Sequence, residues 1–144
     1  NASFQEFSQE IDEKYDLIIS NPPFYNSTYK ELKKERALAR HSESLSYNEL
    51  LLGVSKLLSK EGSFAVIIPF SEEDSFISLA SKVGLFPNRK TRVKGAENTK
   101  IKRSLLQFSF IEKLIETNEL IIEIERHNYT NEYKTLVKDF YLKM

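Results

Sequence analysis

The residues best suited to chemistry are Asn21, Pro22, Pro23 and Phe24, which follow one another directly. Proline fixes φ at about −65° and keeps the residue before it extended, so the Asn21 side chain and the Pro22 carbonyl are held in place. Both groups are acceptors, and together they could bind the two N–H groups of a planar amine. Such acceptors would favour the reactive, pyramidal amine as charge develops. If the amine belongs to a nucleic-acid base, the Phe24 ring could stack on that base and contribute roughly 1–3 kcal/mol to its binding.

The same tetrapeptide is also an ordinary turn sequence, because asparagine and proline each favour turns. Its position favours a functional site. It directly follows Asp16–Ser20, a short apolar run typical of a strand buried on both faces of a parallel sheet. Ligands of open α/β sheets bind beyond the carboxyl ends of such strands.

A helix and a second strand are expected after the motif. Ser46 and Glu49 have the spacing of a capping box, and apolar residues then repeat on one helical face. The run Phe64–Pro69 has the composition of a second buried strand, which completes a strand–helix–strand crossover. Ser71 and Asp74 have the spacing of a second helix cap.

The remaining segments predict an antiparallel tail and a closing helix. Strand-like residues extend over 86–94 and 100–110, joined by a turn at 95–98, and again over 120–125. An amphipathic helix is indicated by a stripe of Tyr133, Leu136, Val137, Phe140 and Tyr141. The whole pattern is that of an α/β protein with helices on the faces of its sheet.

Composition narrows the class of protein. The chain has 144 residues, which suits a single domain over 1–144, and its formal net charge is zero. There is no cysteine and there are only two histidines, so we expect no metal site and a reducing, cytoplasmic compartment. No apolar run approaches the roughly 20 residues that cross a bilayer. Neutrality argues against a protein that coats nucleic acid without specificity.

Local charge nevertheless suggests a nucleic-acid contact. One stretch contains Arg89, Lys90, Arg92, Lys94, Lys100, Lys102 and Arg103, with only Glu97 among them. In a hairpin, Lys90, Arg92 and Lys94 should share a face and could bind phosphates, although a charged strand edge is the alternative. Tyr25, followed by several cations, suits either a loop that closes over a nucleotide or a charged surface loop.

Longer segments resemble a known family. Asp16–Phe24 resembles the catalytic motif of amino methyltransferases that use S-adenosylmethionine and act on adenine, guanine or glutamine amides. Closer similarity lies in Ala39–His41, Leu45–Leu51, Asn128–Thr130 and Phe140–Leu142. These segments are similar to bacterial tRNA adenine-N6 methyltransferases that modify adenosine 37, beside the anticodon of a valine tRNA.

The resemblance implies the second half of a Rossmann-like methyltransferase, in which parallel strands precede an antiparallel hairpin. It implies S-adenosylmethionine as cofactor and tRNA as substrate. The same resemblance implies that Asn21 and Ser3 lie near the cofactor and that Arg40 and His41 contact the substrate. We also expect Arg103 to contact the substrate, because it belongs to the basic stretch. The family's glycine-rich loop would precede residue 1, so we expect little cofactor binding and no activity from this chain alone. Methylation of an rRNA guanine or a protein glutamine, or a non-catalytic RNA-binding role, remains an alternative.

The strand Asp16–Ser20 carries a further expectation. In the parent fold it would lie between two neighbours, of which only one is expected here. A bare apolar edge invites association. We therefore expect this strand to be covered by a second copy of the chain or by the segment Ser3–Glu10 folded back onto it.

Overall fold

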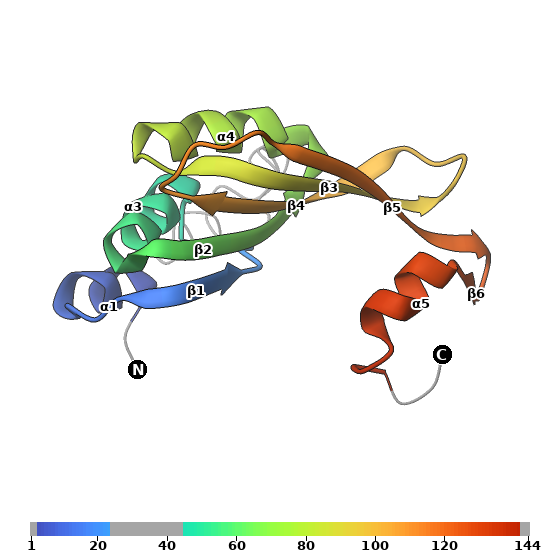
Figure 1. Cartoon of the computed structure of the whole chain (residues 1–144), viewed down its shortest axis with the longest axis horizontal. Helices are drawn as coiled ribbons and strands as arrows, with labels where there is room; N and C mark the ends of the chain where they lie inside the picture. The colour runs from blue at the N-terminus through green and yellow to red at the C-terminus, as the bar shows by residue number, and fades with distance from the viewer. Residues whose placement is uncertain (1–2, 24–44, 142–144) are drawn as a thin grey trace, which may run out of the picture.

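The structure is a computed structural model that describes residues 3–23 and 45–141. Within these ranges, six strands form one sheet in the order β1-β2-β4-β3-β5-β6. Their bounds are Tyr15–Ser20 for β1, Leu58–Pro69 for β2, Phe86–Ala96 for β3, Ile101–Ser109 for β4, Glu116–Glu125 for β5 and Asn128–Tyr129 for β6. The sheet twists across the width of the molecule (Figure 1).

The strand pairing confirms the predicted crossover and the predicted hairpin. β1 and β2 pair in parallel, and β4 pairs antiparallel to both β2 and β3. The expectation of an antiparallel tail is wrong for β5, which pairs parallel to β3. β4 ends beside the start of β3, where Phe86 is aligned with Ser109. The connection 110–115 then crosses to the other side of β3, so β5 starts at the same end of the sheet as β3 does.

Two helices, α3 (Tyr47–Leu57) and α4 (Glu73–Lys82), cover one face of the sheet (Figure 1). The core lies between them and the alternate residues of β2 and β4. Its fully buried members include Leu51, Val54, Phe64, Ile68, Phe76 and Phe108. The rings of Phe64 and Phe108 stack with their centroids 6.0 Å apart. Burial of one face of each element against another is what stabilises a two-layer α/β unit.

The helix starts are only partly as predicted. Ser46 forms the expected capping box, because its hydroxyl accepts from Glu49 N and the Glu49 carboxylate accepts from Ser46 N. The predicted cap of α4 by Ser71 and Asp74 is wrong. A 3-10 turn, η2 (Phe70–Glu72), precedes α4 and leaves its first residue without a side-chain cap. The helix stops just before Gly84, which adopts a positive φ of 77°.

The N-terminal helix α1 (Phe4–Glu10) packs against α3 and does not pair with β1. The expectation that Ser3–Glu10 folds back over the β1 edge is therefore wrong, because this segment forms a helix. Among the described residues β1 pairs only with β2. Leu17 and Ile19 are 58% and 72% exposed.

The chain ends in a projecting unit of β6 and α5 (Asn131–Val137), on the side of the sheet away from α4 (Figure 1). The Thr130 hydroxyl caps α5 by accepting from Tyr133 N. The helix is shorter than predicted, and Leu136 and Phe140 of the expected apolar stripe are largely exposed. No helix in the described ranges has the length and apolarity needed to cross a membrane.

Candidate functional site

The Asn21-Pro22-Pro23 segment continues β1 beyond the carboxyl edge of the sheet. Ser20 is aligned with Val66 of β2, so the segment runs on beside the end of that parallel strand. Pro22 is buried, whereas Asn21 and Pro23 are exposed. Among the described residues the Asn21 side chain has no hydrogen-bond partner. A buried proline thus anchors a backbone from which one amide side chain remains open to a ligand.

A side-chain hydrogen bond also holds β1 at its amino end. The Ser59 hydroxyl donates to Asp16 Oδ1 over 2.7 Å, joining the starts of β1 and β2. The Lys56 ammonium donates to Gln9 O over 2.8 Å, which ties α3 to α1. These contacts orient the strand that carries the motif.

Asn21 lies at one side of an open groove of about 730 Å³, on the sheet face that α3 and α4 leave uncovered. The floor is built from transverse rows of aligned residues. One row is Ile19, Ala65, Gln107, Arg89 and Glu116; the next row, beyond Ser20, contains Ile67, Leu105, Thr91 and Asn118. Glu132 and Leu136 of α5 form the opposite wall. The floor is apolar near β1 and polar near β5, a pattern typical of a binding site.

The half-buried Tyr47, the first residue of α3, packs against the core. Burial raises the pKa of the Tyr47 hydroxyl, and a hydrogen bond to Glu72 and the charge of that carboxylate raise it further. The Tyr47 ring packs edge-on against Phe76, with centroids 4.9 Å apart. Tyr47 lies on the apolar helical face that the sequence predicts after Ser46. The contact with Glu72 joins residues far apart in the chain and has no signal in the sequence.

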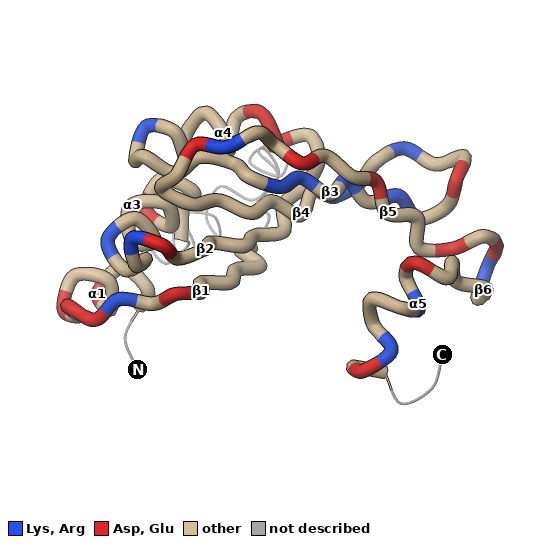
Figure 2. The backbone as a smooth tube through the Cα atoms, viewed as in Figure 1, with Lys and Arg blue, Asp and Glu red and all other residues tan. Residues whose placement is uncertain are grey.

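The basic stretch is paired with carboxylates from neighbouring elements. Figure 2 shows basic positions of β3 close to acidic positions of other elements. The pairs are Arg89 with Glu116, Lys90 and Arg92 with Glu73, and Lys94 with Glu119. Of the three cations predicted to share a face, Lys90 and Arg92 do so, because both contact Glu73. Lys94 follows a register shift in β3 and contacts Glu119 instead. The linear sequence shows only Glu97 within the stretch, because the compensating carboxylates belong to α4 and β5.

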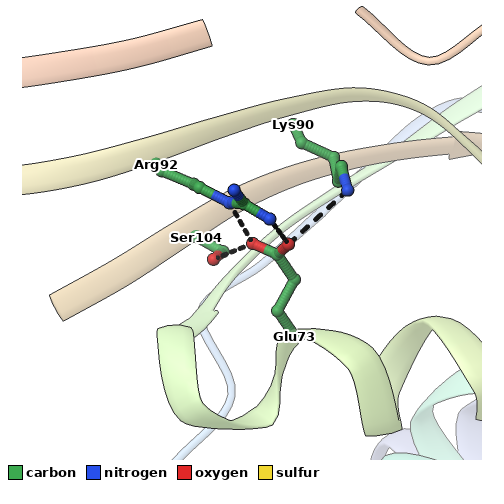
Figure 3. A network of polar contacts seen from close by, with 4 residues as sticks. All are labelled: Glu73, Lys90, Arg92 and Ser104. Atoms are coloured by element: carbon green, nitrogen blue, oxygen red, sulfur yellow. Dashed lines mark hydrogen bonds and ion pairs between the residues drawn. The ribbon is translucent and has the colours of Figure 1, made fainter. Parts of the chain in front are cut away.

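Glu73 is the centre of the most buried of these clusters (Figure 3). Its side chain is 2% exposed. Arg92 donates from Nη2 to Oε1 over 2.7 Å and from Nε to Oε2 over 3.3 Å, and the Ser104 hydroxyl donates to Oε2 over 2.5 Å. Lys90 Nζ lies 3.6 Å from Oε1. Burial alone would raise the pKa of Glu73, but the bonds and charges of these neighbours hold it below its usual value.

Other predicted site residues are placed differently or lie outside the described ranges. Phe24, Tyr25, Arg40 and His41 fall in 24–44, which the structure does not describe. Ser3 is the N-cap of α1, where its hydroxyl accepts from Glu6 N over 3.2 Å, and it does not line the groove. Its predicted cofactor role stays a prediction.

Arg103 lies on β4 near the same edge of the sheet. It is aligned with Pro69 at the end of β2 and with Val93 of β3. Its predicted contact with RNA stays a prediction, as do those of Lys90, Arg92 and Lys94.

Curated relatives match the whole chain. It is 51% identical over 146 residues to the tRNA1(Val) (adenine(37)-N6)-methyltransferase of Christiangramia forsetii and 50% identical over 145 residues to that of Flavobacterium johnsoniae. The match covers 100% of the chain in both cases, and 61% and 62% of these proteins. The chain thus spans about three-fifths of the length of these relatives. No family model matches it.

Solved structures share the fold at low sequence identity. A protein predicted to be an O-methyltransferase from Agrobacterium tumefaciens has a TM-score of 0.60 at 16% identity, over 88% of this chain and 52% of its own. A proposed DNA modification methylase from Thermus thermophilus, in complex with S-adenosyl-L-methionine, has a TM-score of 0.57 at 13% identity, over 93% and 59%. The α/β methyltransferase fold expected from the sequence is confirmed. The chain is homologous over its whole length to bacterial tRNA1(Val) (adenine(37)-N6)-methyltransferases and belongs to their family, which confirms the resemblance found in the sequence.

Proposed function

We propose that this chain carries the amine-binding part of an enzyme that transfers a methyl group from S-adenosylmethionine to N6 of an adenosine in tRNA. The observation that carries the proposal is Asn21, an exposed amide fixed beside a buried proline at the carboxyl end of β1. The names of the curated relatives support adenosine 37 of a valine tRNA as the target.

The chemistry follows from the acceptors. When bound, S-adenosylmethionine would supply a methyl group from its positively charged sulfur. The amine nitrogen would take the methyl as the carbon–sulfur bond breaks, which leaves S-adenosylhomocysteine, and the nitrogen would lose its proton to water. Asn21 Oδ1 and the Pro22 carbonyl accept from the two N–H groups of N6. The hydrogen bonds to these two acceptors strengthen as the nitrogen becomes positive. The acceptors therefore bind the transition state more tightly than the planar amine.

The other predicted residues complete the proposed site. Phe24 and Tyr25 would stack on or enclose the flipped base, and Arg40 and His41 would contact the RNA. Lys90, Arg92, Lys94 and Arg103 would lie toward its phosphates. Asn21 and Ser3 would adjoin the cofactor. A tRNA substrate would place the protein in the cytoplasm.

The product of methyl transfer tests this proposal. The natural full-length protein is incubated with labelled S-adenosylmethionine and a valine tRNA transcript, and the digested RNA is analysed by mass spectrometry. N6-methyladenosine is the expected product. A methylated guanosine, or label found only on protein glutamine, would reject adenine as the target. RNA binding without any methyl transfer would reject an enzyme and leave an RNA-binding role.

We also propose that a second copy of the chain covers the exposed edge of β1. Leu17 and Ile19 are more than half exposed, and a strand edge with unpaired backbone groups readily accepts another strand. The segment contains no lysine or proline that would discourage such pairing.

A further inference from the structure

The guanidinium of Arg92 is only partly occupied by Glu73. Its Nε and Nη2 atoms bind the carboxylate, and among the described residues no hydrogen bond involves Nη1. The side chain is 33% exposed. The Phe70 ring lies against the guanidinium, with Arg92 Cζ 5.2 Å from the ring centroid. A fixed carboxylate and an aromatic face thus hold the group in one plane and leave one edge toward solvent.

At its centre the cluster has one more cation than carboxylates. The side chains of Lys90 and Arg92 both face Glu73, so two cations surround one carboxylate. Asp74 and Glu119 act on Arg92 from further away. An anion that approached the open edge of Arg92 would therefore meet a cation held in place by bonds that the protein itself supplies.

The sheet register relates this cluster to the motif. Ser20, Val66, Leu106 and Lys90 are aligned in one row, and Ile68, Ser104 and Arg92 in a row further on, past the end of β1. Three inter-strand steps of about 4.8 Å separate β1 from β3, or roughly 14 Å. Arg92 thus stands near the same carboxyl edge as the motif, but on the face that α4 covers, whereas Asn21 lines the groove on the other face. An RNA that passes over this edge of the sheet can reach both residues.

We infer that Glu73 is a positioning residue that presents Arg92 to a phosphate of the bound RNA, near the nucleotide held by Asn21. This inference rests on the proposed function and deepens it. Glu73 does not touch the substrate. It fixes the plane of Arg92 through two bonds, while Ser104 fixes Glu73.

The test uses a pair of neutralising substitutions with opposite expected effects. Glu73→Gln removes one negative charge, so electrostatics alone would strengthen RNA binding. Loss of the fixed Arg92 geometry should instead weaken it, roughly threefold to tenfold. Asp74→Asn is the matched control, because the neighbouring Asp74 is exposed and makes no hydrogen bond to Arg92. Affinity for an anticodon stem-loop RNA is measured by fluorescence anisotropy over a range of salt concentrations, with the natural full-length protein.

Arg92→Gln should weaken binding similarly and lower the slope of log affinity against log salt by about 0.7 to 0.9, the value for one phosphate. Adding Glu73→Gln to Arg92→Gln should cause no further loss, because Glu73 acts through Arg92. Circular dichroism checks that each variant is folded. If Glu73→Gln is unfolded, Ser104→Ala removes one bond to Glu73 without a change of charge and should weaken binding in the same direction.

Binding that is unchanged in Arg92→Gln, or strengthened equally by Glu73→Gln and Asp74→Asn, would overturn this inference and leave the proposed function intact. Absence of RNA binding by the unsubstituted protein would overturn both. The two failures are therefore distinguishable in one experiment.

Discussion

Phe4 lies directly against Gly53, at the point where α1 crosses α3. A β-carbon added at Gly53 would lie 2.8 Å from Phe4 Cζ, closer than carbon atoms pack, and 3.2 Å from Ser8 Cβ, which is a tight contact. Gly53 is itself buried in the middle of α3. The glycine therefore sets how closely α1, and the chain that leads into β1, can approach the core.

Gly53→Ala should release α1. Alanine favours a helix over glycine by roughly 0.5–1 kcal/mol, but the overlap with Phe4 costs about 1–3 kcal/mol, so the net effect is destabilising. We expect faster amide hydrogen exchange in residues 4–10. Gly95→Ala is the control, because an added β-carbon there meets its nearest atom, Thr99 Oγ1, at 3.9 Å. Equal exchange in both variants would show that the contact does not hold α1.

The Glu73 cluster should make stability depend on pH. The pKa of Glu73 is lowered in the folded state, so its contribution is fully present above its unfolded pKa of about 4.3 and is lost as pH falls through the lower folded value. Glu73→Gln should lower the free energy of unfolding by roughly 2 kcal/mol at pH 7, the scale of hydrogen bonds to a charged group.

This stability difference between the wild type and Glu73→Gln should shrink below pH 4. Urea unfolding of both proteins at several pH values measures it. A difference that is constant from pH 7 to pH 3 would argue that the charge of Glu73 has no role in stability.

The exposed edge of β1 should cause self-association of this 144-residue chain. Leu17→Lys should convert the associated form to a monomer in light scattering, because lysine at a strand edge opposes pairing with another strand. Ile124→Lys is the control: Ile124 is 66% exposed on β5, away from this edge. A wild-type chain that is monomeric at all concentrations would contradict the proposed pairing.

Local signals in the sequence were enough to predict many elements. The strand β1, the Ser46–Glu49 capping box and the turn between β3 and β4 all involve residues close in the chain, and all are confirmed. The expected burial of β1 on both faces is wrong, because Leu17 and Ile19 are exposed where no second neighbouring strand is described. The position of Asn21-Pro22-Pro23 at the end of a strand was likewise predicted from the sequence. Alternation of charge and apolarity does not encode the direction of a partner strand, so the parallel pairing of β5 with β3 was missed.

Contacts between distant residues could not be predicted. Arg92 and Ser104 bind the carboxylate of Glu73, which lies 19 and 31 residues away in the chain. The local sequence around Glu73 gives no sign of such distant partners. The basic stretch therefore looked unpaired. In the fold, four of its cations, Arg89, Lys90, Arg92 and Lys94, face carboxylates of α4 or β5.

The turnover of Asn21→Ala tests the central claim most directly. In the natural full-length protein, methyl transfer to valine tRNA should fall at least about 100-fold, the scale of losing one aligned transition-state group, while affinity for S-adenosylmethionine changes only a few-fold. Asn118→Ala is the matched control, because Asn118 lines the same groove but its amide already donates to Glu116 over 2.8 Å. We expect its turnover to stay near that of the wild type. Turnover of Asn21→Ala within a few-fold of the wild type would contradict the assignment of Asn21 to the reacting amine.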